Sequence, residues 1–314
     1  MRIGPLLAAV PATSRSLVPL ADIRLRSPAG YHGWAPQPRQ RPDRGVSRGR
    51  PPFLLPPGTA TLPAMIDLQI HGPVARLVLN RPQVRNALPI AGWEALARHV
   101  EAVERSGARA LLLGGAAGAF CAGADLAEFE LLRTDEPARL RFRSAMRRAV
   151  DALRDLPIAT IAWVEGPCFG AGVALAMASD MRVASETARF AITPAKMGIG
   201  YPQQDVERLV SLVGPGWAAR LLFTGGTIDA GEAERIGLVE AVAAPEEMEA
   251  LVQSVLACDA ASIAMLKRGI GKALRGIAED EEQDRRFDSF FASDALAERL
   301  SRRRTGGALP PERR

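Results

Sequence analysis

The sequence is poor in cysteine and histidine, and it contains no apolar run long enough to span a membrane. Its three cysteines, Cys121, Cys168 and Cys258, are far apart and odd in number, which indicates a reducing compartment and no disulfide framework. None of the three histidines lies near a cysteine, so the sequence shows no zinc-binding pattern. We therefore expect a cytoplasmic protein with no metal site and no membrane contact.

Acidic residues are scarce in residues 1–64, which carry nine arginines, two aspartates and twelve of the 24 prolines. The whole chain has a formal net charge of +5, so the remainder is slightly acidic and argues against nucleic acid as a partner. We expect residues 1–64 to be a disordered extension, or an over-long gene start with Met65 as the true start. The Arg-rich, acid-poor composition also leaves a targeting segment open.

The usual phosphate-binding motifs are missing as well. No glycine-rich stretch ends in Gly-Lys followed by Ser or Thr, which excludes a P-loop. Gly166, Gly170 and Gly172 lie deep in the chain and in the wrong spacing for a dinucleotide-binding fingerprint.

From Met65 onward, short apolar segments alternate with helical periodicity, which predicts an α/β fold. Residues 66–70 and 74–80 read as a hairpin, and residues 135–155 as a long helix. The chain is mostly helical from about residue 203. We divide it into a core at 65–255 and a helical region with a loose tail at 256–314.

Two glycine-rich stretches, "GAFCAGADLAEF" (118–129) and "EGPCFGAGVALAMASD" (165–180), each follow a predicted buried strand and lead into a predicted helix. Two such turns can each direct one backbone N–H group at the same point. That arrangement is the geometry of an oxyanion hole, in which a bound carbonyl becomes an enolate at lower energy.

Four segments in order resemble the crotonase family, also called the enoyl-CoA hydratase/isomerase family. They are "LNRPQVRNAL" (79–88), "AFCAGADL" (119–126), "VEGPCFGAGVALAMASDMRVAS" (164–185) and "AERIGLVEAV" (233–242). The resemblance implies a spiral of ββα units with a helical C-terminal region that assembles homotrimers or hexamers. It also implies an acyl-CoA thioester held by two backbone N–H groups, which would be those of Ala124 and Ala171.

The same resemblance implies the positions that contact coenzyme A, which is part of the substrate, so that no separate cofactor is expected. These positions are Arg85, Ala87, Ala122, Asp125 and Leu126. Arg85 matches a position near the CoA phosphates and adenine, although it also reads as a solvated surface arginine. Asp125 matches a family aspartate that is mostly structural.

Hydratases of this family use two glutamates, and this sequence has Ala174 and Ala195 at the matching positions. Neither alanine can carry a proton, so hydration by the usual route is in doubt. Tyr201 matches a tyrosine of methylmalonyl-CoA decarboxylase-like members, but a histidine common in them would fall at Ala124. The nearby carboxylates Glu165, Asp205 and Glu207 read as surface or ion-pair residues.

We therefore expect an acyl-CoA lyase or isomerase of the crotonase family that stabilises a thioester enolate. One alternative is a methylmalonyl-CoA decarboxylase-like lyase that uses Tyr201. The other is a non-catalytic acyl-CoA-binding protein. Phe287, Phe290 and Phe291 could line an acyl pocket, or they could be ordinary core residues.

Overall fold

The computed structural model describes residues 65–304, so the predicted extension at 1–64 and the tail after residue 304 lie outside the described residues. The strands are β1 (Ile66–His71), β2 (Val74–Leu79), β3 (Ala110–Gly115), β4 (Ala159–Val164), β5 (Pro167–Phe169), β6 (Met181–Ala184), β7 (Arg189–Ala191), β8 (Ile228–Asp229) and β9 (Ala241–Val242). The α-helices are α1 (Ile90–Glu104), α2 (Phe129–Thr134), α3 (Glu136–Asp155), α4 (Ala171–Met177), α5 (Gln203–Thr224), α6 (Ala230–Arg235), α7 (Pro245–Leu256), α8 (Ala260–Ala273), α9 (Glu281–Phe291) and α10 (Asp294–Arg304). Short 3₁₀ helices are η1 (Pro82–Val84), η2 (Leu126–Glu128) and η3 (Pro194–Met197).

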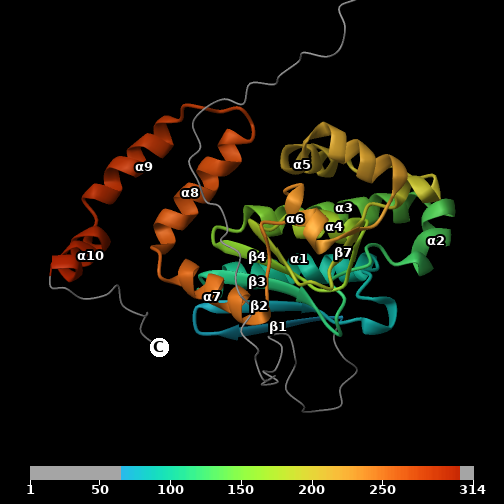
Figure 1. Cartoon of the computed structure of the whole chain (residues 1–314), viewed down its shortest axis with the longest axis horizontal. Coiled ribbons are helices and arrows are strands. Elements are labelled where there is room, and N and C mark those ends of the chain that lie inside the picture. Colours follow the sequence, from blue (N-terminus) through green and yellow to red (C-terminus); the bar gives the residue numbers. More distant parts are fainter. Residues whose placement is uncertain (1–64, 305–314) are drawn as a thin grey trace, which may run out of the picture. The chain divides into compact units, whose positions relative to one another are not determined.

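The larger sheet has the strand order β1-β2-β3-β4-β6-β9. Figure 1 labels its first four strands, which lie side by side in this order. β1 and β2 form the predicted antiparallel hairpin, in register from the Ile66–Leu79 pair to the His71–Val74 pair. Every later pairing in this sheet is parallel, as expected where helices connect the strands.

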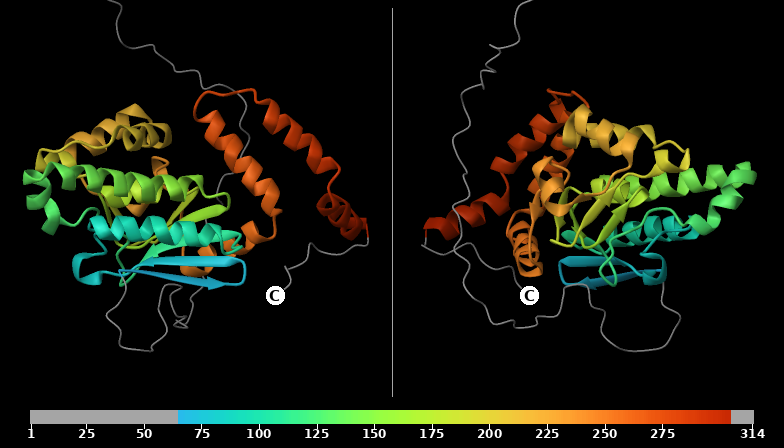
Figure 2. Two further views of the ribbon diagram at one scale, coloured as in Figure 1. Left: turned by 180° about the vertical axis from the view of Figure 1, so that it is seen from behind. Right: turned by 45° about the vertical axis from the view of Figure 1, so that its right-hand side comes forward.

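Helices cover both faces of this sheet, which explains why β3 is apolar at successive positions. Leu111 and Leu113 pack on the side of α1, whereas Ala110 and Leu112 pack on α7 through residues such as Met248. The helix α3 lies against α1, as the reverse view in Figure 2 also shows.

A smaller sheet has the strand order β5-β7-β8, and its strands interleave along the chain with β6 and β9 of the larger sheet. Its strands are two or three residues long, and β5 leads directly into the turn that begins α4. The helix α5 lies in the region predicted to be mostly helical from about residue 203, and it is kinked at Gly214, which has φ +73° before Pro215.

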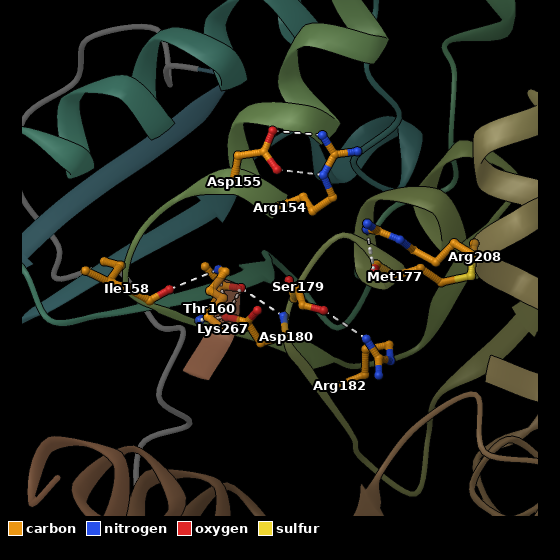
Figure 3. A network of polar contacts seen from close by, with 10 residues as sticks. All are labelled: Arg154, Asp155, Ile158, Thr160, Met177, Ser179, Asp180, Arg182, Arg208 and Lys267. Carbon is orange, nitrogen blue, oxygen red and sulfur yellow. Dashed lines mark hydrogen bonds and ion pairs between the residues drawn. The ribbon is translucent and has the colours of Figure 1, made fainter. Parts of the chain in front are cut away.

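The last three helices, α8, α9 and α10, form an arm of residues 260–304 beside the sheets (Figures 1 and 2). Lys267 of α8 attaches the arm by donating to the Ile158 carbonyl oxygen at 3.0 Å and to Asp180 Oδ2 at 2.8 Å (Figure 3). The same Asp180 oxygen accepts from the Thr160 N–H at 2.8 Å, so one carboxylate ties α8 to β4. Among residues 65–304 no single helix is long and apolar enough to cross a membrane; α7 and α8 pass that test jointly but are bent by 103°.

Candidate active site

Two glycine turns, residues 118–125 and 166–172, run side by side. The Cys121 N–H donates to the Pro167 carbonyl oxygen at 3.0 Å, and the Phe169 N–H donates to the Cys121 carbonyl oxygen at 2.9 Å. These two bonds form a short parallel ladder that joins the predicted turns, although they are about 50 residues apart in the sequence.

Close packing of the two turns requires glycine at positions 123 and 172. Gly123 has φ +100°, and a Cβ added there would lie 3.1 Å from the Ala171 nitrogen. A Cβ added at Gly172 would overlap the Cys121 carbonyl oxygen. Because Ala124 directly follows Gly123, standard backbone dimensions place its nitrogen no more than roughly 7 Å from that of Ala171.

The N–H groups of Ala124 and Ala171 take part in none of the hydrogen bonds formed among residues 65–304. The next amide along the first turn, that of Asp125, is by contrast bonded to the Leu88 carbonyl oxygen at 3.0 Å. Backbone donors away from solvent are nearly always paired, so two neighbouring unpaired donors are available to an acceptor that binds between them.

Both alanines line a cavity of about 280 Å³, which we call the glycine-turn cavity. Its walls are mostly apolar and come from the two turns, from α2 and α3, and from the segment before α5. The large apolar residues of the lining are Leu126, Phe129, Phe142, Met146, Met197, Ile199 and Pro202. Two charged residues, Arg143 and Asp205, also line it. An apolar cavity with a few polar groups is typical of a small-molecule site.

Ala174 and Ala195, which the resemblance matches to the family glutamates, offer no proton-transfer group. Ala174 is buried in the first turn of α4, and Ala195 is exposed in η3. Pro194, the residue before Ala195, lines the glycine-turn cavity, so the cavity extends to this segment.

Tyr201 lines the glycine-turn cavity, and its hydroxyl donates to the Gly170 carbonyl oxygen at 3.1 Å. Burial, together with the nearby Asp205 carboxylate, raises the pKa of the Tyr201 phenol well above its ordinary value. The hydroxyl is therefore protonated and directed at the turn that carries Ala171. Its use by a decarboxylase-like lyase stays a prediction.

Asp205 is an ion-pair residue, as one of the two predicted interpretations has it, and it also lies buried on the cavity wall. It is 3% exposed, lines the glycine-turn cavity and forms an ion pair with Arg147 Nη1 at 3.0 Å. Burial raises its pKa, against the opposing effect of the arginines. The other two carboxylates that we considered lie elsewhere, because Glu165 and Glu207 do not line this cavity. The only sequence signal for Asp205 is its position at the start of a helix close behind Tyr201.

The predicted CoA-contacting residues gather along the first turn. The Ala122 N–H donates to the Arg85 carbonyl oxygen at 2.9 Å, which places the segment of Arg85 and Ala87 beside residues 122–125. Ala122 and Leu126 line the glycine-turn cavity, whereas Arg85 is exposed outside it and Ala87 is buried.

Asp125 has a structural role at the start of η2. Its carboxylate pairs with Arg81 at 2.8 Å and accepts from the Ala127 N–H at 3.1 Å. Burial acts to raise the pKa of Asp125, but the hydrogen bonds from Arg81 and Ala127 prevail and lower it. These contacts fix the end of the first turn.

Arginines stabilise the far end of α4. Arg208 Nη1 donates to the Met177 carbonyl oxygen at 3.0 Å, and Arg182 Nη1 donates to the Ser179 carbonyl oxygen at 2.9 Å (Figure 3). Cations at a helix C-terminus satisfy its free carbonyl groups and complement its dipole. They hold in place the helix that begins with Ala171.

Comparison with known proteins assigns this arrangement to a family. The family model described as enoyl-CoA hydratase/isomerase matches residues 69–300. The chain belongs to the enoyl-CoA hydratase/isomerase family. A Rhizobium meliloti protein named "Probable enoyl-CoA hydratase" is 32% identical over 241 residues, which cover 74% of this chain and 92% of that protein.

Solved structures agree with the family assignment. An enoyl-CoA hydratase/carnitine racemase from Magnetospirillum magneticum matches with a TM-score of 0.75 and 28% identity, covering 79% of this chain and 96% of that one. An enoyl-CoA hydratase from Bacillus anthracis matches with a TM-score of 0.71 and 26% identity, covering 78% and 97%. The predicted crotonase-like α/β fold with a helical C-terminal region is therefore confirmed.

Members of the enoyl-CoA hydratase/isomerase family bind acyl-CoA substrates. In this member the two glycine turns and the apolar cavity are present, and Ala174 and Ala195 carry no acid or base. Family membership therefore does not fix which reaction follows binding.

Proposed function

We propose that the protein binds an acyl-CoA thioester with its carbonyl oxygen between the N–H groups of Ala124 and Ala171, and that it stabilises the enolate formed there. The observation that carries the proposal is the pair of neighbouring, unpaired backbone donors on the wall of an apolar cavity. Fixed donors need no reorganisation when negative charge develops on the oxygen, and each such donor contributes about a hundred- to a thousandfold in rate.

The reaction we propose is enolate-forming lyase or isomerase chemistry without the two family glutamates. General acid–base groups contribute roughly a hundred- to ten-thousandfold, and Ala174 and Ala195 contribute nothing of this kind. Efficient hydration would need another residue to activate water. If no other residue supplies an acid or base, the protein would bind the thioester without turnover.

A decarboxylase is the second candidate, and Arg143 favours it. Arg143 lines the glycine-turn cavity and has no ion-pair partner among residues 65–304. A guanidinium group pairs well with a carboxylate, which a malonyl-type thioester carries on its acyl group. Loss of carbon dioxide would leave its bonding electron pair in the enolate, which Ala124 and Ala171 would stabilise.

A panel of CoA esters tests these alternatives. The protein would be titrated with, and then incubated with, crotonyl-CoA, malonyl-CoA and methylmalonyl-CoA, and the products would be analysed by mass spectrometry. Gain of water indicates hydration, loss of carbon dioxide indicates decarboxylation, and saturable binding without a product indicates a binding protein. If none of the esters binds, the proposed site is wrong.

We include assembly in the proposal. Exposed apolar side chains on α8 and α9, such as Leu266 and Phe291, support a homotrimer or hexamer because large apolar patches commonly mark protein interfaces. We also propose a cytoplasmic location, and a reaction that needs no cofactor besides the coenzyme A of the substrate.

A further inference from the structure

Asp205 is the one carboxylate among the residues that line the glycine-turn cavity. It occupies the first turn of α5, where its N–H donates to the Pro202 carbonyl oxygen at 2.9 Å. Its position is thereby fixed by the helix start, directly after the cavity-lining segment that contains Tyr201. The residue is nine-tenths or more buried, so its side chain faces the protein interior and the cavity rather than bulk solvent.

The two carboxylate oxygens of Asp205 have different surroundings. Oδ1 pairs with Arg147 Nη1 at 3.0 Å, whereas Oδ2 is buried and has no hydrogen-bond partner among residues 65–304. A buried carboxylate oxygen without a donor is costly, because its lost hydration is not replaced. An unpaired oxygen beside a ligand cavity does not stabilise the fold, so it points to a role in function.

Asp151 provides the contrast. It shares Arg147 with Asp205 but lies on α3, is 31% exposed and does not line the cavity. Both of its oxygens lie in ion pairs, Oδ2 with Arg147 Nε at 3.0 Å and Oδ1 with Arg154 Nη1 at 2.7 Å. Asp151 Oδ1, like Asp205 Oδ2, is buried and makes no hydrogen bond among residues 65–304, so the two carboxylates differ in exposure and in contact with the cavity. Asp151, one helical turn from Arg147 on α3, is therefore a carboxylate with only a structural role, and it serves as the comparison for Asp205.

Charged and titratable groups face Asp205 from three sides. Arg147 and Asp151 come from α3, Arg208 comes from α5 itself, and Tyr201 comes from the segment before it. Burial raises the pKa of Asp205 and Asp151 adds to this effect, while Arg147 and Arg208 oppose it. A carboxyl group with a raised pKa exchanges protons more readily near neutral pH than an ordinary aspartate does.

We propose that Asp205 moves the proton at the α-carbon of the bound thioester, a task that Ala174 and Ala195 cannot perform. The inference rests on the proposed function, because the thioester must first bind between Ala124 and Ala171. The carboxylate takes the α-proton, and the C–H electron pair forms the C=C bond of the enolate. The negative charge moves to the thioester oxygen between the two N–H groups. Return of a proton from the carboxyl group to the α-carbon restores the thioester.

Deuterium exchange measures this step directly. Butanoyl-CoA would be incubated with the protein in D₂O, and uptake of deuterium at the α-carbon would be followed by mass spectrometry. We expect uptake with the unmodified protein and a loss of about a hundredfold or more with Asp205→Asn. Asp205→Glu should restore part of the rate. Asp151→Asn, the matched control that also removes a partner of Arg147, should exchange at the original rate.

The pH profile separates proton transfer from a structural role. Because the base form reacts, exchange should fall as the pH drops through the pKa of Asp205, which lies above that of an ordinary aspartate. Asp205→Asn should lose this dependence while still binding butanoyl-CoA and unfolding at a similar temperature.

Three outcomes would overturn the inference. If the unmodified protein binds butanoyl-CoA but exchanges no deuterium, or if Asp205→Asn exchanges as fast as it does, Asp205 is not the proton-transfer group, although the proposed thioester site stands. If butanoyl-CoA does not bind at all, the proposed function fails first and the inference fails with it.

Discussion

The body of the protein (residues 65–256) and the arm (residues 260–304) differ in how their apolar side chains are covered. In the body, large side chains such as Trp93 and Trp163 are fully buried. In the arm, α9 and α10 contain no buried residue, and Ile270 and Phe291 are 64% and 67% exposed. The body completes its own core, whereas the arm presents apolar surface and is held to the body by polar contacts from Lys267.

The proposed active site and the proposed assembly surface therefore lie in different regions of the protein. Both glycine turns, the unpaired amides and Asp205 belong to the body, so a local change there should affect binding and turnover. The three phenylalanines Phe287, Phe290 and Phe291 instead line a separate cavity of about 350 Å³ within the arm. Changes in the arm should affect association between chains more than the reaction.

The largest effect should come from removing one backbone donor of the body. Ala171→Pro deletes an N–H group at the first helical position, where proline is tolerated. We expect a loss of about a hundred- to a thousandfold in turnover or in deuterium exchange. Ala171→Gly keeps the N–H group and should retain most activity. Equal losses in both variants would contradict the assigned role.

Adding a side chain where the two glycine turns touch should destabilise the body. A side chain at Gly172 would overlap the Cys121 carbonyl oxygen, so Gly172→Val should lower the free energy of unfolding by about 1–3 kcal/mol. Chemical denaturation provides the measurement. Gly200→Val is the control, because an added Cβ there meets no atom within 4 Å. Equal stability of the two variants would show that the turns pack less closely than described.

Detaching the arm should have a moderate effect. Lys267→Met removes the donor to Ile158 and Asp180, and we expect a loss of about 1–3 kcal/mol, reduced by the partial exposure of Asp180. Hydrogen exchange should quicken in α8 and remain slow in β3. Lys272→Met, which breaks a pair with Asp280 inside the arm, should leave the attachment of α8 unchanged.

The smallest effect on folding should come from the exposed face of the arm. Phe291→Ser changes a side chain that is 67% exposed, so the stability of one chain should shift by no more than about 0.5 kcal/mol. The predicted trimer should nevertheless weaken, which sedimentation velocity would detect. An unaltered distribution of assembly states would remove this face from the interface.

Much of the fold could be predicted from local patterns, because the hairpin and α3 have a clear apolar period and β3 and β4 are continuous apolar runs. The strands β5, β8 and β9 were not predicted, since two or three residues carry no measurable alternation. The kinked α5 reads as two helices because Gly214 and Pro215 are ordinary helix-ending residues.

The candidate site, too, could be predicted from the sequence only in part. The glycine spacing and the family resemblance gave the two turns, and the structure brings them together. The burial of Asp205 depends on Arg147, which lies 58 positions away in the sequence, and no local pattern encodes such a contact. The hydrogen bond from the Tyr201 hydroxyl to the Gly170 carbonyl oxygen could not be predicted either, because the two residues are distant in the sequence.

The central claim is that the amides of Ala124 and Ala171 hold one thioester oxygen. The infrared carbonyl band of butanoyl-CoA labelled with carbon-13 at the thioester carbon tests it most directly, measured on saturated protein. Two hydrogen bonds should polarise the carbonyl and move the band to lower frequency, with a smaller shift in Ala171→Pro. A bound carbonyl whose band matches that of free butanoyl-CoA would contradict the account.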